Sequence, residues 1–235
     1  MTINPNVSVD CVVYGFDGQS LNVLLIEQKD LGQGNKQFAL PGDLVMEDES
    51  LDEAAKRVLK ELTGLSGIYL RQFHAFGDPN RVKNVKDLQW LQSYRENPQA
   101  RVITVAYLAL VKMDKFKPAA SSFAERVFWE EIHEIPPLAF DHNSIFETGL
   151  SSLRIQFETN HIGFELLPKK FTLNQLQILY EAVLDKELDK RNFRKKVLKE
   201  SWVTPLEEKQ KGVLHKPARL YSLNEEVAYS ESPVL

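Results

Sequence analysis

The segment from residue 40 to residue 65 constrains this chain more than any other, because it contains a helix whose two ends are both marked. Ser50 followed by Glu53 is the pattern of a capping box, and Gly64 is a helix stop signal. Between them, apolar residues recur at the spacing of one buried helix face, at Leu51, Ala54, Ala55, Val58, Leu59 and Leu62. The sequence therefore predicts a helix over residues 51–63 that packs on a core by one face.

The same segment resembles the Nudix box, the strand, loop and helix that hold a divalent metal and a diphosphate in Nudix hydrolases. The matching residues are Leu40, Pro41, Gly42, Glu49, Arg57, Glu61 and Gly64. The family pattern has two further glutamates where this chain has Val58 and Leu62, and a loop glycine where it has Asp43. Magnesium requires oxygen ligands, which valine and leucine lack. The resemblance therefore implies a Nudix fold without metal-dependent hydrolysis, and we expect no catalytic residue, metal site or cofactor.

Composition favours a soluble protein with one basic part. The chain has 235 residues and a single cysteine, which cannot form an internal disulfide. No N-terminal signal segment is evident, and the longest apolar run, 102–111, is too short to cross a bilayer. We therefore expect a cytoplasmic protein with no membrane partner. Residues 166–222 hold 13 lysine and arginine residues against 7 aspartate and glutamate residues. This excess favours a separate module with an anionic partner.

Most of the β structure is expected before residue 135. Apolar and β-branched runs predict strands at residues 7–16, 21–29, 38–40, 68–76, 101–113 and 126–130. Asp17-Gly18 predicts a hairpin between the first two. Asp141 is expected to cap a helix that ends near Asn160.

The segment 82–97 is predicted to be an insertion with a short amphipathic helix. Val85, Leu88 and Leu91 would form its buried stripe, and this spacing leaves Trp90 outside the stripe. Two interpretations stay open. The segment is either a surface flap with one packed aromatic residue or a lid or dimer contact, since tryptophan is enriched at interfaces.

A second module follows, with the pattern of a winged helix-turn-helix. Thr172 with Gln175 forms another capping box, and Asp189 is the N-cap of the next helix. That helix would bury Phe193 and Val197 and carry its basic residues outward. Residues 202–206 and 218–223 can pair as a hairpin, which would form the wing. Two capped helices, a tight turn and a wing predict binding to DNA.

Together the two modules resemble the NrtR group of Nudix-related transcriptional regulators. The resemblance implies an α/β (α+β) fold: a Nudix-fold domain with a mixed sheet and flanking helices at residues 1–160, and a C-terminal winged helix-turn-helix at residues 161–235. It also implies a repressor that binds double-stranded operator DNA and responds to a small effector. We expect a homodimer, because a single small module rarely buries enough surface for tight and selective binding to DNA.

The effector is the least determined part of this expectation. The long 82–97 segment differs from the short loop of the ADP-ribose type, and the chain resembles most the arabinose-responsive members of the group. We therefore expect a regulator of sugar catabolism released from DNA by L-arabinose. The alternatives are an ADP-ribose-responsive regulator of NAD metabolism, an active Nudix hydrolase that uses Glu49 and Glu61 with other carboxylates such as Glu47 or Asp48, and a binding protein without DNA.

Two sets of site residues follow from the resemblance. The effector is expected to contact some of Gln28, Phe38, Asp43, Asp78, Arg81 and Trp129. DNA contacts are expected from Thr172, Gln175, Lys190, Arg191, Asn192, Arg194, Lys195, Lys199, Lys209, His215, Lys216 and Arg219. Of these, Arg191, Asn192 and Lys195 are expected to reach base edges, because arginine suits guanine and asparagine suits adenine. Wing residues such as Lys209, Lys216 and Arg219 are expected to contact phosphates.

Overall fold

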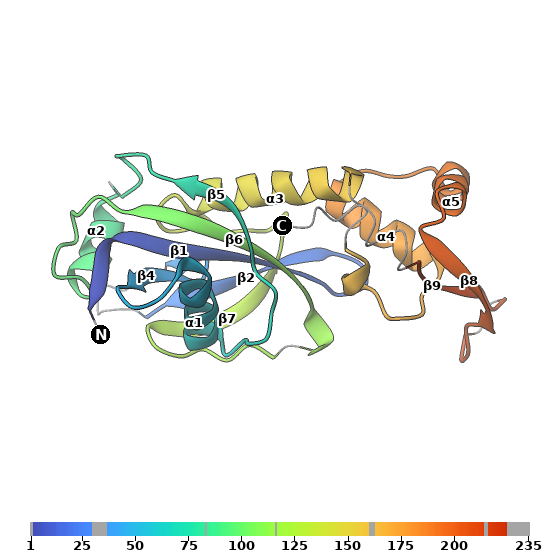
Figure 1. The fold of residues 1–235 in the computed structure, drawn as a ribbon, viewed down its shortest axis with the longest axis horizontal. Helices are drawn as coiled ribbons and strands as arrows, with labels where there is room; N and C mark the ends of the chain where they lie inside the picture. The colour runs from blue at the N-terminus through green and yellow to red at the C-terminus, as the bar shows by residue number, and fades with distance from the viewer. Residues whose placement is uncertain are drawn as a thin grey trace. The chain divides into compact units, whose positions relative to one another are not determined.

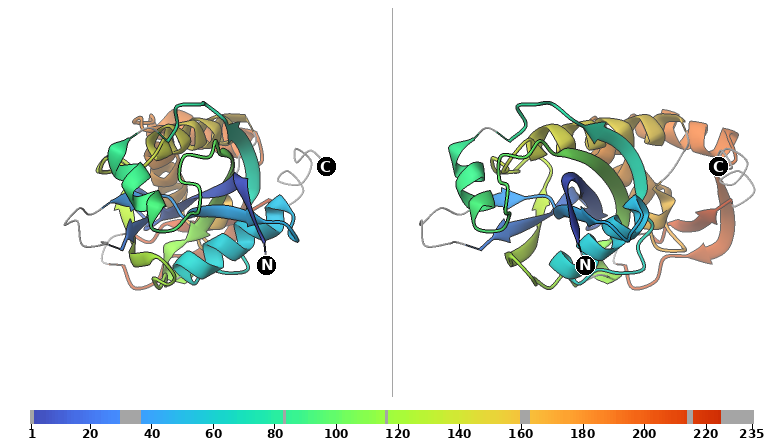
Figure 2. Two further views of the ribbon diagram at one scale, coloured as in Figure 1. Left: turned by 90° about the vertical axis from the view of Figure 1, so that its left-hand side faces the viewer. Right: turned by 60° about the vertical axis from the view of Figure 1, so that its left-hand side comes forward.

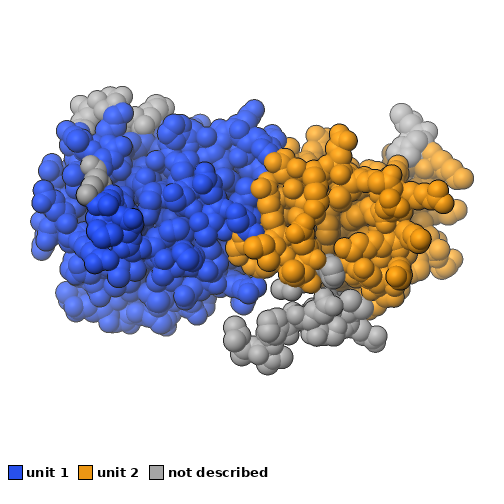
Figure 3. Space-filling view, turned by 90° about the horizontal axis from the view of Figure 1, so that it is seen from above, with its two compact units in different colours: residues 1–15, 22–151 blue, residues 16–21, 152–235 orange. Residues whose placement is uncertain are grey.

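The computed structural model of the chain describes residues 2–29, 37–82, 84–115, 117–159, 163–213 and 216–224. The chain divides into two compact units, coloured separately in Figure 3. Unit 1 comprises Met1–Gly15 and Asn22–Ser151, and unit 2 comprises Phe16–Leu21 and Ser152–Leu235. This division falls within a helix. The domain boundary expected between residues 160 and 161 stays a prediction.

A seven-stranded sheet forms the centre of unit 1 in the described residues (Figure 1). Its strands are β1 (Ile3–Phe16), β2 (Leu21–Gln28), β3 (Phe38–Ala39), β4 (Gly42–Met46), β5 (Arg71–Phe76), β6 (Ile103–Lys112) and β7 (Ala124–Glu131). The order along the main path is β3-β2-β1-β6-β5, while β4 pairs with β1 and β7 pairs with β2. A short 3-10 helix, η1 (Met113–Lys115), follows β6. The predicted strands are all present, although several boundaries shift by a few residues.

Strand β4 was not expected from the sequence, because Pro41-Gly42 has the character of a loop. It pairs antiparallel with β1, so that Gly42 lies opposite Asp10. A Cβ atom at residue 42 would collide with the carboxylate of Asp10. Glycine is therefore required here by the close approach of a buried charged side chain.

Helix α1 (Leu51–Thr63) covers one face of the sheet (Figure 2). Ser50 and Glu53 form both hydrogen bonds of the capping box, and Gly64 ends the helix with a left-handed φ of 71°. The apolar stripe of α1 joins Val9 and Cys11 of β1 in the core. The predicted helix is confirmed at both ends.

The first half of α3 (His142–Thr159) lies on the opposite face of the sheet (Figures 1 and 2). Its Gly149 packs against Val12 and Tyr14 of β1, and the Tyr14 hydroxyl donates a hydrogen bond to the Phe146 carbonyl at 3.2 Å. Successive strand residues point to opposite faces, so β1 is covered on both sides. Asp141 directly precedes α3, and its carbonyl accepts a hydrogen bond from the Ile145 amide at 3.1 Å, while its carboxylate is bound by Arg81.

Helix α2 (Val85–Gln92) forms in the segment between β5 and β6, as predicted, but it turns a different face to the protein. Leu91 is buried, whereas Val85 is 67% exposed. Asp87 is buried instead, and its carboxylate accepts hydrogen bonds from the Phe140 amide and the Gln37 side chain. These partners compensate the desolvation of Asp87 and fix the rotation of the helix. The predicted stripe is therefore wrong at Val85.

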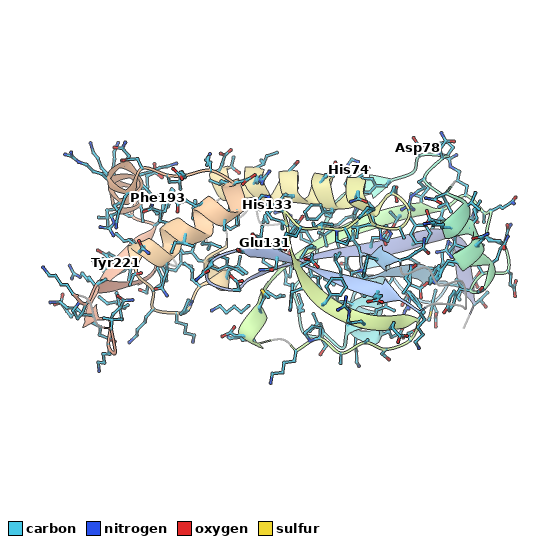
Figure 4. All side chains as sticks on the ribbon, turned by 180° about the vertical axis from the view of Figure 1, so that it is seen from behind. His74, Asp78, Glu131, His133, Phe193 and Tyr221 are labelled. Atoms are coloured by element: carbon cyan, nitrogen blue, oxygen red, sulfur yellow. The ribbon has the colours of Figure 1, made fainter. Side chains whose placement is uncertain are left out.

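Unit 2 contains the predicted helices and hairpin. Its elements are η2 (Phe164–Leu166), α4 (Leu173–Leu184), α5 (Lys190–Lys199), β8 (Val203–Lys209) and β9 (Arg219–Leu223). Asp189 caps α5 by accepting a hydrogen bond from the amide of Asn192. Tyr180 of α4 packs on Phe193 of α5 and on Trp202, with ring centroids 5.5 and 6.0 Å away. Figure 4 labels Phe193 of α5 and Tyr221 of the antiparallel β8–β9 hairpin. Within the described residues, no helix has the length and apolar character needed to span a membrane.

Candidate functional site

The charged residues that match the Nudix-box pattern contact one another within the domain. Arg57 donates to both carboxylate oxygens of Glu49, at 2.8 and 2.6 Å, to Glu61 at 3.0 Å and to the Leu44 carbonyl at 2.9 Å. The hydrogen bonds from Arg57 lower the pKa of Glu49. These bonds hold the loop between β4 and α1 against the helix. They also engage Glu49 and Glu61, the two carboxylates of the Nudix-box pattern that this chain retains.

The two replaced box positions lie in the core. Val58 is 0% exposed and Leu62 is 1% exposed, and both belong to the apolar cluster beneath α1. In the described part of the chain, no group of three or more histidine, cysteine, aspartate or glutamate side chains is arranged to hold a metal ion.

A cavity of about 270 Å³ opens in unit 1 beside the box. Its polar lining includes Asp10, Gln28, Asp43, Arg81, Arg95 and His142, and its aromatic lining includes Trp90, Tyr94, Phe123 and Phe140. The lining comes from β1, β2 and β4, from the start of α3 and from the segment between β5 and β6. Residues far apart in sequence therefore meet in one open cavity.

One wall of the cavity is a network of paired charges. The Arg81 guanidinium donates to both oxygens of Asp141, at 2.8 and 2.7 Å, and lies 3.7 Å from Asp10. The Asp10 carboxylate also accepts from Thr104 at 2.7 Å and lies 3.3 Å from His142 Nε2. Burial alone would raise the pKa of Asp10, but His142, Arg81 and Thr104 together lower it to about 2. Asp10 is therefore a buried, ionised anchor of this wall.

Two other polar groups of the lining lack hydrogen-bond partners. Gln28 Oε1 and Trp90 Nε1 are buried and have no hydrogen-bond partner among the described residues. Burial lowers the pKa of Arg95 and raises the pKa of Asp43. The Arg95 side chain forms no hydrogen bond with a residue that the structure describes, but its charge is attracted by the carboxylate of Asp43. The cavity thus combines a fixed ionic wall with polar groups that lack partners.

The Trp90 ring is held by other rings. Its centroid lies 4.5 Å from that of Tyr94, 5.3 Å from that of Phe123 and 6.2 Å from that of Phe140. The last two contacts are edge-to-face, which is a favoured geometry for aromatic pairs. The indole of Trp90 therefore has a fixed orientation in the cavity wall.

In unit 2, the outer face of α5 is basic and exposed. Phe193 and Val197 are buried, whereas Arg191, Asn192 and Lys195 are exposed. The i, i+4 spacing of Arg191 and Lys195 places them on one side of the helix. This face has the charge and the side-chain types needed for phosphates and base edges.

Comparison with known proteins identifies the architecture. A model of the NUDIX domain matches residues 4–149. The chain belongs to the Nudix family. A model of the NrtR DNA-binding winged helix domain matches residues 163–223. The chain therefore has the NrtR-type combination of a Nudix domain and a winged helix, and the predicted fold class is confirmed.

Two similar proteins align over nearly the whole chain, and the structure of a separate Nudix domain aligns over part of it. The ADPR responsive transcriptional repressor NtrR of Acinetobacter baylyi is 29% identical over 222 residues, covering 93% of this chain and 82% of the relative. Shewanella oneidensis NrtR complexed with a 27mer DNA has a TM-score of 0.70 and 27% identity, covering 95% of both chains. The Nudix domain of the same Shewanella protein, complexed with ADP ribose, has a TM-score of 0.50 and 25% identity, covering 64% of this chain and 89% of that chain.

These relatives correct the expected effector. The Acinetobacter relative is an ADPR responsive repressor and the Shewanella Nudix domain binds ADP ribose in its complex, so the expected closeness to the arabinose-responsive members is not supported. The alternative of an ADP-ribose-responsive regulator agrees better with them. The Nudix-box departures at Val58 and Leu62 agree with a regulator.

The structure brings together only part of the expected effector set. Gln28, Asp43 and Arg81 line the Nudix cavity. Phe38 instead packs edge-to-face on Phe128, with centroids 5.6 Å apart. The remaining two also lie outside the lining, since Asp78 is exposed on the loop after β5 (Figure 4) and Trp129 packs against the core beneath α1.

Sequence reasoning missed several lining residues, among them Asp10, Trp90, Tyr94, Arg95 and His142. One signal could have identified part of this group. Trp90 lies outside the apolar stripe of its helix, and a large aromatic residue in such a position requires its own burial site. No sequence signal links Asp10 to His142, because Asp10 of β1 and His142 of α3 meet only in the folded domain.

The residues expected to contact DNA differ in their exposure and in their hydrogen bonds within the protein. Lys190, Arg191, Asn192, Lys195, Lys199, Lys209 and Lys216 are exposed. Thr172 is 3% exposed, and its hydroxyl is engaged with Gln175 in the capping box. Arg194 is partly buried, and Arg219 is exposed but donates to Leu206 and Glu207 of the wing. His215 lies outside the described residues. Of the predicted set, the outer face of α5 and the two wing lysines are the most accessible to DNA.

Proposed function

We propose that this chain is a DNA-binding transcriptional repressor whose affinity for its operator is lowered by ADP-ribose bound in the Nudix domain. The observation that carries the proposal is the similarity over 95% of both chains to Shewanella NrtR in complex with DNA. The exposed basic face of α5 agrees with it, because it offers the side chains that read bases and bind phosphates. The choice of ADP-ribose is supported by the similarity to the ADPR responsive repressor of Acinetobacter and to the Shewanella Nudix domain in complex with ADP ribose.

We also propose that the regulator acts as a homodimer. A single winged helix contacts few base pairs, whereas a twofold dimer reads two half-sites about one helical turn apart. The effector would then change DNA affinity by preferring one dimer arrangement over another. Analytical ultracentrifugation of the chain with and without operator DNA measures this stoichiometry.

A mobility-shift assay tests the main proposal. The chain is incubated with DNA from upstream of the genes that neighbour its own gene, in the presence of ADP-ribose, L-arabinose or neither. We expect a specific complex that ADP-ribose dissociates and L-arabinose does not. Dissociation by L-arabinose alone would contradict the effector, and equally weak binding to every duplex would contradict the DNA-binding role.

A second candidate function is hydrolysis, which the similarity to an ADP-ribose pyrophosphatase of Methanocaldococcus jannaschii brings into consideration. That protein is 27% identical over 145 residues, covering 62% of this chain and 73% of the relative. The buried Val58 and Leu62 and the engaged Glu49 favour the regulator. Product release from ADP-ribose with magnesium or manganese, abolished by Glu61→Gln, would instead support an active enzyme.

A further inference from the structure

A second cavity, of about 350 Å³, lies within unit 2. Its lining comes from the C-terminal part of α3, from α4 and the turn after it, from α5 and from Trp202. The volume falls within the range of roughly 300 to 1,000 Å³ that is typical of small-molecule sites. The proposed function uses the outer face of α5 and does not account for this cavity.

Aromatic rings form much of the apolar lining of the cavity. Phe157, Tyr180, Phe193 and Trp202 all line it, and all are buried. Besides its contacts with Phe193 and Trp202, the Tyr180 ring packs edge-to-face on Phe157, with centroids 5.3 Å apart. Rings that pack on one another in this way have fixed orientations, and a further planar ring can join them by stacked or edge-to-face contacts. The cavity therefore suits an aromatic ligand.

The hydroxyl group of Tyr180 has no hydrogen-bond partner among the described residues, although the side chain is only 4% exposed. Buried polar groups in native proteins are nearly always paired, so this exception requires an explanation. Burial, together with the nearby charge of Glu200, raises the pKa of Tyr180, so the hydroxyl group keeps its proton and can donate. An acceptor atom on a ligand would supply the missing partner.

The charged side chains of the lining indicate the charge of the ligand. The carboxylates are engaged, since Glu158 accepts from Lys186 at 2.8 Å and Asp189 caps α5. Lys196 forms no hydrogen bond with a described residue, although Glu158 attracts its charge, and its Nζ lies 5.2 Å from the centroid of the Trp202 ring. The Tyr180 hydroxyl and this ammonium group are both donors. Such donors bind a carboxylate more strongly than a neutral acceptor.

We propose that the cavity of unit 2 binds a small aromatic carboxylate. The ring of the ligand packs on the aromatic lining, and its carboxylate accepts hydrogen bonds from Tyr180 and Lys196. The site is separate from the proposed ADP-ribose site, because the two cavities share no lining residue. A ligand in this site contacts α5, the helix that is proposed to read DNA.

Saturation-transfer NMR titrations of the full chain test the site. The probes are benzoate, benzyl alcohol, which lacks the negative charge, and cyclohexanecarboxylate, which lacks the aromatic ring. The variants are Tyr180→Phe, which removes only the hydroxyl group, and Lys196→Met, which removes only the charged group. The matched controls are Tyr221→Phe and Lys169→Met, since neither residue lines the cavity. Thermal melting without ligand checks that each variant is folded.

We expect benzoate to bind about tenfold more tightly than either of the other two probes. Tyr180→Phe and Lys196→Met should each weaken benzoate binding about tenfold, whereas the two controls should leave it unchanged. Without ligand, Tyr180→Phe should melt at or above the temperature of the wild type, because it removes a buried hydroxyl group that has no partner.

Several results would overturn the proposal. Benzoate that does not saturate the wild type, or that binds the two folded cavity variants as tightly as the wild type, means that the site is wrong. If Arg95→Met instead abolishes the binding, benzoate occupies the Nudix cavity. Cyclohexanecarboxylate that binds as tightly as benzoate means that the ligand class is wrong. A large loss of stability on Tyr180→Phe would show that the hydroxyl group already has a partner within the protein.

Discussion

Helices α1 and α5 are both capped and charged, yet they use their charges in opposite ways. On α1, Arg57 is bound to Glu49 and Glu61 of its own unit. On α5, Arg191 and Lys195 are exposed, and no carboxylate among the described residues pairs with them. Both helices bury an apolar stripe. They differ in whether their charged side chains pair with other residues of the protein.

This difference indicates which helix has a partner outside the protein. Charges that are paired internally fix a loop and have little capacity left for a ligand. Exposed cations without internal partners gain favourable contacts only when a polyanion arrives, and on DNA they release condensed counterions. Helix α1 therefore serves a structural role in the Nudix domain. Helix α5 instead presents a charged surface for binding DNA.

Val58→Glu should have the largest effect, because it returns a family carboxylate to a position that is now core. The side chain of Val58 is 0% exposed, so the substitution would bury a charge without a partner. We expect the Nudix domain to lose on the order of 4 kcal/mol of stability, measured by urea unfolding. Lys60→Glu, at an exposed position of α1, is the control. A stable variant that gains magnesium binding would show that α1 is still a latent metal site.

Asp10→Asn tests the internal pairing of charges in the cavity wall. The pKa of Asp10 is lowered from 3.8 to about 2, so ionisation of this carboxylate stabilises the fold above pH 4. That contribution is lost as the pH falls from about 4 to 2. The substitution should therefore cost about 2 kcal/mol at neutral pH and flatten this part of the stability profile.

Thermal melting between pH 2 and pH 7 measures the effect of Asp10→Asn. Glu208→Gln is a suitable control, since the Lys170–Glu208 pair is about half exposed on both sides and exposed pairs contribute little. Equal pH profiles for the wild type and Asp10→Asn would mean that the network around Arg81 does not depend on this carboxylate.

Arg191→Ala tests the opposite use of charge on α5. Loss of a base-edge contact should reduce operator affinity about tenfold and relax base preference at one position of each half-site. Fluorescence anisotropy with the operator and with single-base variants measures both. Arg57→Ala on α1 should leave DNA affinity unchanged, which is the matched expectation for an internally paired arginine. Uniform weakening across all operator variants would reassign Arg191 to a phosphate contact.

The helices and their caps could be predicted from the sequence because their signals are local. Ser50 with Glu53, Thr172 with Gln175 and Asp189 each form the hydrogen bonds that their spacing predicts. Such bonds join residues within one turn and need no knowledge of the rest of the chain. The winged helix was predictable for the same reason.

The cavity was not predictable, because its lining depends on tertiary contacts. Asp10, Arg95 and His142 come from three distant segments and meet only in the folded domain. The rotation of α2 depends on Asp87, which is buried because Phe140 and Gln37 supply its hydrogen bonds. Neither partner is visible in the helix itself, so the apolar pattern alone left Trp90 out of the site.

Lys216→Ala should have the smallest effect on DNA binding. It tests whether the wing contacts phosphates while α5 contacts base edges. Lys216 is exposed before β9 and has a flexible ammonium group that suits phosphate more than a base edge. Its loss should weaken binding only a few-fold, by the same factor on operator and random duplexes, and should reduce the salt slope of log K by about 1. Anisotropy titrations at several salt concentrations measure this slope, and Lys211→Ala at the wing tip provides a neighbouring comparison. A change in base preference on Lys216→Ala, with the salt slope unchanged, would show that the wing reads sequence and that α5 is not the only reader.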